Sequence, residues 1–428
     1  MTSAIIAATG KGRSLRALEA TNFFLADVQT GIGPFLAAYL AGAGWNPGRV
    51  GLALTVGGIV TVALQTPAGA LVDNLRFKRG IILAGISVLG VSALLLTAST
   101  APWAVYTAQV LIGSVGPFLG PTLAAITMGL VGSALFDRQF GRNQGFNSAG
   151  NVATAALIAG VSHAFGNRAI FITTFFLIFP TILAVSMIRP RDIDYQLARG
   201  GTRPDSKSPE QKPLIKALLD DRVMATFLLC AFLFHLGNAA MLPELGEMLS
   251  TKSKSSAAPL MAACILVTQV VITCTAAFVG RLANAYGRKP LLLLGFGVLP
   301  IRAVLYTLTH NAASLIAIQV FDGIANSIFG VVAILVVADR AAGTGRFNLM
   351  QGVLATSVGL GAALSNLFGG KIVQAAGYPT SFLALGGVAA LAFTLLLFFM
   401  PETLPRTGSH GNSGTAGPEI DDSMGSAT

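Results

Sequence analysis

The sequence GALVDNLRFKRG, at residues 69–80, returns in altered form as GRLANAYGRKP at residues 280–290. Two further segments recur in the same order: QVLIG at 109–113 recurs as QVFDG at 319–323, and DRQFGR at 137–142 recurs as DRAAGTGR at 339–346. The copies lie 202 to 211 residues apart. This nearly constant offset predicts that the chain consists of two similar halves, with any central site between them.

Charged residues are scarce along the whole chain. Only 11% of the 428 residues are Asp, Glu, Lys or Arg, about half the usual share of a soluble domain, and the mean hydropathy is +0.71. Cys230, Cys264 and Cys274 all lie in apolar segments, so no disulfide framework is indicated. The composition excludes an ordinary soluble enzyme, a disordered chain and a secreted disulfide-rich domain. It predicts an all-α protein that crosses the membrane many times.

Apolar segments long enough to cross a bilayer follow one another along the chain. A membrane-spanning helix needs about 20 residues, because each residue rises about 1.5 Å through about 30 Å of hydrocarbon. Twelve such spans are predicted, six in each half: 18–42, 48–72, 80–99, 103–132, 145–165, 168–188, 223–243, 257–281, 290–309, 313–337, 348–369 and 379–400.

The distribution of Lys and Arg predicts how these spans are oriented. With the N-terminus in the cytoplasm, 22 of the 28 basic residues fall in cytoplasmic segments, 5 fall in external ones, and Arg302 lies inside a span. We therefore expect a multi-pass protein of the cell membrane (inner or plasma) with both termini in the cytoplasm. The same distribution explains the net charge of +10 without a nucleic-acid partner.

Two hydrophilic segments divide the chain. Residues 189–222 contain Gly, Pro and mixed charge, which is typical of a cytoplasmic linker. Residues 405–428 are rich in Gly, Ser and Thr, which is typical of a disordered tail. We therefore predict an N-terminal six-helix bundle at 1–188 and a C-terminal six-helix bundle at 223–404.

The repeated segment at 69–80 and 280–290 resembles the cytoplasmic signature of the major facilitator superfamily, Gly-x-x-x-Asp-x-x-Gly-Arg-Lys, and the resemblance extends over residues 17–400. The first half matches at Gly69 and Asp73, and differs at Arg76 and Phe77, where Gly and Arg are usual. The second half matches at Gly280, Gly287, Arg288 and Lys289, and Asn284 replaces the acid. The resemblance implies the major facilitator fold, with twelve helices in two pseudo-symmetric bundles.

The resemblance also implies a cytoplasmic gate. In that family, the Asp of the signature lies near the positive N-terminal end of a helix in the other half and holds the cytoplasmic side closed. The corresponding gate residues here are Gly69, Asp73, Arg76, Arg79, Gly280, Asn284, Gly287 and Arg288. Alternatively, the basic residues after Asp73 serve only as topology signals.

The chain departs from the family at two positions that bear on coupling. Gln109 stands where the family often carries an Arg linked to proton coupling. The fifth span also lacks the Gly-Pro signature of many antiporters. Export therefore does not follow from the motifs.

Two ionisable residues lie at similar depth in neighbouring spans of the second half. Arg302 is about 12 residues from the cytoplasmic end of its span, and Asp322 is about 9 residues from the external end of the next. A charge in hydrocarbon is unfavourable by about 3 kcal/mol or more, so we expect an intramembrane ion pair. Its role is either purely structural or part of transport.

Asp27 and His235 are the other ionisable residues predicted inside spans. Asp27 lies about 10 residues into the first span, close to the midplane, with no basic residue of its own half nearby. A buried carboxyl group can bind and release a proton near physiological pH, so Asp27 is the leading candidate for proton coupling. His235, at similar depth in the seventh span, is the second candidate. For both residues, the alternative is a packing role.

Amide side chains are candidates for a substrate cavity. Asn143, Asn147 and Asn151 share one face of the fifth span, and we expect Asn143 at its cytoplasmic mouth. Amides either bind a substrate or join helices to one another. The predicted cavity-lining residues are Asn147, Asn151, Gln65, Asn238 and Gln351. Glu244 and Glu247 are expected in a wet external vestibule.

The sequence contains no metal-ligand spacing of His and Cys, no phosphate-binding loop and no soluble region large enough for a nucleotide domain. It therefore predicts neither an enzyme, nor a cofactor, nor a metal site. We predict a monomeric secondary transporter that moves a small organic compound across the lipid bilayer by alternating access, with protons as coupling ion and export as the leading direction. Two alternatives stay open: proton-coupled or facilitated uptake of a small metabolite, and a membrane sensor that transports nothing.

Overall fold

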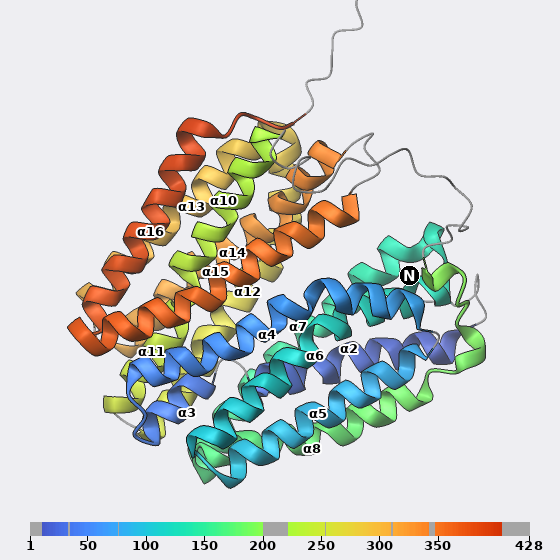
Figure 1. Ribbon diagram of the computed structural model, residues 1–428, viewed down its shortest axis with the longest axis horizontal. Coiled ribbons are helices and arrows are strands. Elements are labelled where there is room, and N and C mark those ends of the chain that lie inside the picture. The colour runs from blue at the N-terminus through green and yellow to red at the C-terminus, as the bar shows by residue number, and fades with distance from the viewer. Residues whose placement is uncertain are drawn as a thin grey trace, which may run out of the picture.

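Figure 1 shows a computed structural model of the chain. The structure describes residues 11–32, 35–75, 77–199, 221–252, 254–309, 311–341 and 347–404. All regular secondary structure within these ranges is helical. The predicted all-α membrane fold is therefore confirmed.

Six predicted spans of the first half correspond to seven helices: α2 (Gly12–Ile32), α3 (Leu36–Gly42), α4 (Pro47–Asn74), α5 (Lys78–Ala98), α6 (Pro102–Val131), α7 (Ser133–Phe165) and α8 (Arg168–Met187). The second half repeats this pattern: α10 (Arg222–Asn238), α11 (Met241–Lys252), α12 (Lys254–Tyr286), α13 (Arg288–Leu308), α14 (Ala312–Ala341), α15 (Phe347–Ala376) and α16 (Tyr378–Phe399). The first and seventh spans are each divided in two, as α2 with α3 and α10 with α11. Two short 3₁₀ helices, η1 (Pro190–Asp192) and η2 (Leu197–Arg199), follow α8.

Helix boundaries follow local sequence signals. The Asn46 side chain accepts a hydrogen bond from the Arg49 backbone N–H at 2.9 Å, and Pro47 occupies the first turn of α4. Gly287 and Gly377 adopt φ values of +101° and +84°, which only glycine takes up readily, and each separates two successive helices. These turns reverse the chain between α12 and α13 and between α15 and α16 in the second half.

Ten helical segments among the described residues are long and apolar enough to cross a membrane. Two predicted spans are not among these ten segments: the first, which corresponds to α2 and α3, and the fifth, which corresponds to α7. The sequence of α7 carries Asp137, Arg138, Arg142 and a stripe of three Asn residues, which lowers its hydropathy. A polar helix is tolerated in a membrane protein when its polar face is turned away from lipid.

The two halves use equivalent helix pairings. Helix α2 packs against α7 and α8, and α10 packs in the same way against α15 and α16. Likewise α4 and α5 pack against α6, while α12 and α13 pack against α14. Each half also contains a hydrophobic core of its own, around Ile82 and Val105 in the first and around Phe227 and Leu292 in the second. The sequence repeat thus corresponds to a structural repeat.

The halves meet at one end of the molecule among the described residues. We call the end near residues 11, 199, 221 and 404 the linker end, and the opposite end, with the α3–α4 and α15–α16 turns, the far end. Helix α4 packs against α15, α7 against α12 and α3 against α11. Thr55 Oγ1 donates a hydrogen bond to the Ala363 carbonyl oxygen at 2.9 Å, and Phe35, Ile158 and Met261 share an apolar cluster. All these residues lie toward the far end of the molecule. Figure 1 shows that the two six-helix halves diverge toward the linker end.

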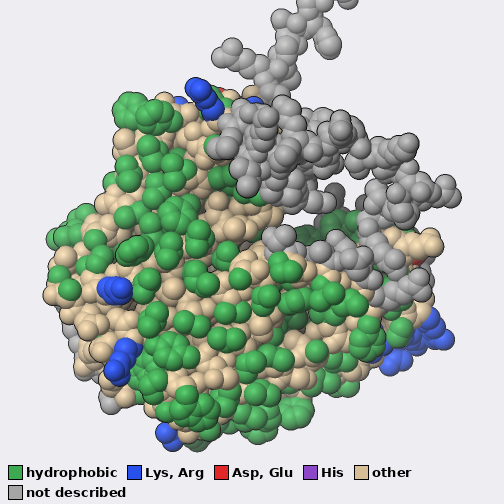
Figure 2. Space-filling model, in the orientation of Figure 1, with side chains coloured by type: hydrophobic (Ala, Val, Ile, Leu, Met, Phe, Trp, Pro, Cys, Tyr) green, Lys and Arg blue, Asp and Glu red, His purple; other side chains and the backbone are tan. Residues whose placement is uncertain are grey.

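The surface between the ends is apolar. In Figure 2 hydrophobic side chains are spread over the visible face, and the few visible Lys and Arg side chains lie on its left part, at the top and at the lower right, away from its centre. Large exposed side chains of this kind include Phe176, Leu183, Phe278 and Phe398. A surface of this composition is suited to lipid rather than to water.

Candidate functional site

A polar cavity lies within the first half, between α2, α6 and α7. Its volume is about 430 Å³, and its lining includes Asn22, Gln144 and Asn147 together with Gly116 and Gly120. A Cβ atom added at either glycine would meet nothing within 4 Å, so these residues keep this wall of the cavity free of side chains. The cavity combines a largely apolar wall with a few amide groups, which is typical of small-molecule sites.

The Asn stripe of α7 divides into two parts. Asn147 lines the cavity, and Asn151 Nδ2 donates to Asn147 Oδ1 at 3.4 Å. Asn143, by contrast, is buried, with Nδ2 donating to Thr127 Oγ1 at 3.0 Å and Oδ1 accepting from Gln139 at 3.0 Å. Asn143, expected at the cytoplasmic mouth of its span, lies in the linker-end half of α7, but its amide is buried and joins α7 to α6.

An ion pair between the half-buried Arg142 and the buried Glu19 joins α2 to α7 beside this amide. Arg142 Nε donates to Glu19 Oε1 at 2.5 Å, and Gln139 Nε2 donates to the same oxygen at 3.2 Å. Glu19 is only 4% exposed. Sequence reasoning missed this pair, because Glu19 stands at the edge of the predicted first span. The signal that could have found it is its spacing, since Glu19 lies three residues before Asn22 and so shares a polar face of α2 with that amide.

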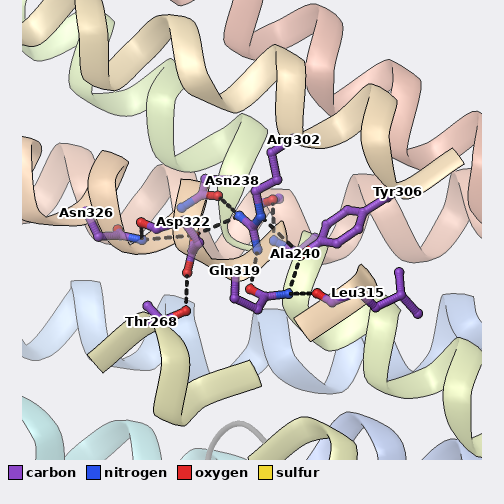
Figure 3. A network of polar contacts seen from close by, with 10 residues as sticks. Asn238, Ala240, Thr268, Arg302, Tyr306, Leu315, Gln319, Asp322 and Asn326 are labelled. Atoms are coloured by element: carbon purple, nitrogen blue, oxygen red, sulfur yellow. Dashed lines mark hydrogen bonds and ion pairs between the residues drawn. The ribbon is translucent and has the colours of Figure 1, made fainter. Parts of the chain in front are cut away.

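The second half contains a larger polar network around Arg302 (Figure 3). Arg302 Nη1 lies 2.7 Å from Asp322 Oδ1, so the structure brings these two predicted partners together as an ion pair. Arg302 Nη1 also donates to Asn238 Oδ1 at 2.5 Å, and Nη2 donates to Gln319 Oε1 at 3.3 Å. The Tyr306 hydroxyl accepts from Arg302 Nε at 3.1 Å.

Asp322 is held from a second side. Thr268 Oγ1 donates to Asp322 Oδ2 at 3.3 Å, and Asn326 Nδ2 donates to Asp322 Oδ1 at 2.9 Å. The network thereby links α10, α12, α13 and α14. Asn238 belongs to it rather than to the cavity described above, and its side chain already has a partner in Arg302.

His235 lies in an aromatic cluster. Its ring packs edge-on against Phe329, with ring centroids 4.7 Å apart, and lies 5.1 Å from the Phe234 ring. Its Nδ1 is 3.0 Å from the carbonyl oxygen of Ala231, one turn earlier in α10. These contacts favour a packing role for His235.

The remaining predicted cavity residues lie on α4 and α15, one of the helix pairs that join the halves. Gln65 on α4 and Gln351 on α15 are both half-buried. Each lies closer to the linker end than Thr55 and Ala363, which join these two helices.

Asp27 belongs to α2, but its side chain lies outside the described residues, as does that of Asp73 on α4. Gly69 belongs to α4 as well, and its surroundings lie outside the described residues. Arg76 lies outside the described residues altogether.

The predicted gate residues form a cluster in the second half. Arg288 is 5% exposed, and its Nε donates to Asp339 Oδ2 at 3.0 Å while Nη1 donates to Asn284 Oδ1 at 2.8 Å. Glu402 accepts hydrogen bonds from the backbone N–H groups of Arg288 and Lys289, at 2.8 and 3.0 Å. Asn284 thus contacts its own half.

Two other gate residues have simpler surroundings. Arg79 donates to the carbonyl oxygens of Val185 and Ser186 at the end of α8, within its own half. Gly280 is half-buried in α12, and a Cβ atom added there would approach only Val331 of α14, at 3.8 Å. A gating role for these residues therefore stays a prediction.

Glu244 and Glu247 lie where sequence reasoning did not expect them. Each is only 2% exposed, so the prediction of a wet vestibule is wrong for this structure. The break before α11 turns these residues toward α15 and α16 instead of toward water, and Glu244 Oε1 accepts a hydrogen bond from Ser381 Oγ at 2.9 Å. Within the described part of the chain, no group of three His, Cys, Asp or Glu residues is arranged to hold a metal ion.

Two repeated helical bundles with an apolar surface, one of which contains a cavity lined in part by amides, are typical of a membrane transport protein. The family model of the Major Facilitator Superfamily matches residues 20–276 and 228–420. An uncharacterised MFS-type transporter of Mycobacterium tuberculosis (strain H37Rv) is 39% identical over 393 residues, which are 92% of this chain and 94% of the relative. The riboflavin transporter RibZ of Clostridioides difficile is 26% identical over 133 residues, or 31% of this chain and 29% of that protein.

Solved structures share the fold. The nucleoside transporter NupG superposes with a TM-score of 0.73 at 14% identity, covering 90% of this chain and 98% of that one. A bacterial homologue of the human drug peptide transporters PepT1 and PepT2 gives a TM-score of 0.65, at 13% identity, over 90% of this chain and 97% of that one. The chain belongs to the Major Facilitator Superfamily. It is a transporter, and its substrate is not specified by these relatives.

Proposed function

We propose that the protein exports a small organic compound by alternating access, in exchange for protons that enter the cell. The observation that carries this proposal is the asymmetry of the interface between the halves. Contacts such as Thr55 with Ala363 close the far end, whereas the halves diverge at the linker end. A transporter in this state opens the space between its halves to one compartment only.

The bias of Lys and Arg assigns the open end to the cytoplasm. The segments predicted on the cytoplasmic side, which include the loops between helices as well as the N-terminal segment, the linker and the tail, hold 22 of the 28 basic residues. The structure then corresponds to an inward-open state, in which a compound enters from the cytoplasm. Rocking of the two bundles about the central cavity would open the far end to the outside.

The cavity supports a small substrate with hydrogen-bonding groups. Its polar lining consists of the amides of Asn22, Gln144 and Asn147, which carry no charge and both donate and accept hydrogen bonds. A volume of about 430 Å³ lies within the range of small-molecule sites. Gln65 and Gln351 extend this amide lining along α4 and α15 in the proposal.

Asp27 is the proposed proton carrier. It lies in α2 five residues after Asn22, a cavity residue, and about halfway across the bilayer. In an antiporter the substrate and the proton compete for the acid. The unloaded acid must then bind a proton from the outside before the inward-open state returns.

The test is a flux assay in everted membrane vesicles, with a panel of compounds that includes nucleosides, peptides and riboflavin, in the presence and absence of a proton gradient. We expect gradient-driven uptake into the vesicles of at least one compound, and its loss in Asp27→Asn. Asp194→Asn, which changes an exposed acid of the linker segment, is the matched control and should transport normally. Undiminished proton-driven flux in Asp27→Asn would refute the role of Asp27, and movement in the opposite direction would favour uptake.

A further inference from the structure

A pair of acidic residues lies buried on α11, away from the cavity and from the Arg302 network. Glu244 and Glu247 are one helical turn apart, and each is 2% exposed. Glu244 Oε1 accepts from Ser381 Oγ, and the backbone of Gly369 is so close that a Cβ atom there would overlap this oxygen. The pair therefore points into the packing between α11, α15 and α16.

One oxygen of each carboxyl group has no hydrogen-bond partner among the described residues. Oε2 of Glu244 and Oε2 of Glu247 are both buried and, among the described residues, form no hydrogen bond. None of the ion pairs formed by the described residues includes either glutamate. An ionised carboxylate without partners is strongly unfavourable in such a place, and two adjacent ones repel each other as well. One proton shared by the pair removes the repulsion, and a proton on each carboxyl group removes both difficulties.

The neighbouring helices offer no cation in compensation among the residues that the structure describes. Near the far end of the helices packed against α11, the titratable or charged residues with described side chains are Tyr39 on α3, His235 on α10, Cys264 on α12, Lys371 on α15 and Tyr378 on α16. The others on these helices lie farther along α10 and α12 toward the linker end: Arg222, Cys230, Cys274, Arg281 and Tyr286. Lys371 is exposed, and the Tyr39 hydroxyl donates to the Leu96 carbonyl oxygen at 2.8 Å, away from the pair. Tyr378 is half-buried and near enough to interact electrostatically with both glutamates. The side chains of Lys252 and Lys254 lie outside the described residues.

The position of α11 connects this pair with the closed end of the molecule. Helix α11 packs against α3 of the other half, and its Leu242 contacts the apolar cluster of Phe35 and Met261 that joins the halves. Opening of the far end must separate α11 from α3. Water can then reach a helix whose acidic residues are enclosed in the present state.

We propose that Glu244 and Glu247 form a proton-binding site on the far-end gate: the pair holds a proton while the far end is closed, and releases it to that compartment when the far end opens. The inference rests on the alternating access proposed above and adds a second site to Asp27. The proton is exchanged with water, and no other bond changes. By linkage, raising the pH favours the open far end, because only the open state releases the proton readily.

The first measurement follows the opening itself and needs no substrate. Spin labels at Arg49→Cys and Ala375→Cys, two exposed far-end positions in different halves, report the distance between α4 and α15 in full-length protein in lipid nanodiscs. Cys274, which is exposed, is replaced by Ser in this background. We expect the ratio of far-open to far-closed protein to rise with pH, by up to about tenfold per pH unit for each proton released.

Variants separate the pair from other titrating groups. Glu244→Gln with Glu247→Gln mimics the loaded pair and should keep the far end closed at every pH. Glu402→Gln, the same substitution at the linker end, should retain the pH dependence. Ser381→Ala removes the donor to Glu244 Oε1 while leaving both acids in place, and should shift the midpoint of opening without abolishing it.

The second measurement detects the proton directly. In protein that carries Asp27→Asn, infrared difference spectra of the closed state should show the C=O band of a protonated carboxyl group, and this band should be lost when Glu244→Gln and Glu247→Gln are added. Three results would overturn the inference: a pH dependence unchanged in the double variant, a band that persists when these two substitutions are added, or opening that depends on Na⁺ instead of pH. A far end that never opens under any condition would refute alternating access as well, whereas opening without pH dependence would refute this inference alone.

Discussion

A buried charge is stable when hydrogen bonds replace the water that it loses, and Arg302 meets this condition. Its Nε bonds Tyr306, its Nη1 bonds Asn238 and Asp322, and its Nη2 bonds Gln319. The guanidinium group is thus held in one orientation between helices of the same half. A group with this many fixed partners is suited to holding α10, α13 and α14 together.

Removal of one partner of this ion pair should destabilise the protein. In Asp322→Ala, Arg302 stays buried at 1% exposure without its countercharge, so we expect a loss of about 3–5 kcal/mol in the free energy of unfolding. Thermal unfolding of the purified protein in detergent measures the change. Arg302→Met combined with Asp322→Leu should recover most of this loss and retain transport. A double variant that folds but transports nothing would show that the pair belongs to the transport pathway.

Contacts of individual residues could be predicted from the sequence only where they depend on depth in the membrane alone. Arg302 and Asp322 meet because their predicted depths agree. The position of Glu244 and Glu247 near the outer end of their span predicts contact with water. They are buried instead, because the helix break near residue 240 turns α11 into the protein. Asn143 and Asn147 share one helix face, yet only the packing of α6 distinguishes a buried amide from a cavity amide.

At the scale of elements, α4 and α15 approach closely because glycines line their contact. A Cβ atom at Gly51 would overlap the Asn366 carbonyl oxygen, and one at Gly370 would overlap that of Pro47. Close approach of this kind through small residues is typical of helices packed within membranes. At the far end the backbones of α4 and α15 are therefore in direct contact.

Gly51→Val should weaken this closure. The added side chain would force α4 away from α15, and a loss of about 1–2 kcal/mol corresponds to a change of about 5–30-fold in a two-state ratio. A Cys introduced at Ala363, which is 2% exposed, should then react correspondingly faster with a membrane-impermeant thiol reagent added at the far side. The control is Gly160→Val, at a position where an added Cβ meets nothing within 4 Å. Equal reactivity in the two variants would contradict the glycine contact.

Glu402 should stabilise the start of α13 in a pH-dependent way. Burial alone would raise the pKa of its carboxyl group, but hydrogen bonds from the backbone N–H groups of Leu404, Arg288, Lys289 and Thr403 outweigh burial and lower the pKa. A lowered pKa in the folded state stabilises the fold fully above the ordinary carboxyl pKa of about 4.3. This stabilisation is lost as the pH falls through the lowered pKa.

The corresponding experiment compares melting temperatures of the wild type and Glu402→Gln between about pH 6 and about pH 3. We expect the wild type to be more stable at the upper end, by a modest amount because Glu402 is exposed, and the difference to vanish at the lower end. A difference that is independent of pH would show that the carboxylate charge contributes nothing to the capping of α13.

At the scale of the whole molecule, the sequence predicts more than at the smaller scales. The order of apolar spans and the repeat near 69–80 and 280–290 indicate two six-helix halves, and the helix pairings agree with this arrangement. Hydropathy predicts the spans well because every segment that crosses the lipid must satisfy its backbone hydrogen bonds internally, as an apolar helix does. The state of the transporter could not be predicted, because which end is closed depends on contacts between the halves, such as Thr55 with Ala363, that no local pattern encodes.

The orientation of the molecule decides what its open end means, and it can be tested on the full-length chain. If the linker end faces the cytoplasm, a single Cys at Ala43, which is exposed at the far end, should be labelled in intact cells by a membrane-impermeant reagent. A single Cys at Gln196, exposed in the segment after α8, should be labelled only after the membrane is permeabilised. The excess of 22 basic residues over 5 gives the physical reason, since cytoplasmic loops retain positive charge. The parent protein with Cys274→Ser is the unlabelled control, since Cys230 and Cys264 are buried. The reverse labelling pattern would make the present state outward-open, and the proposed entry of substrate from the cytoplasm would then be wrong.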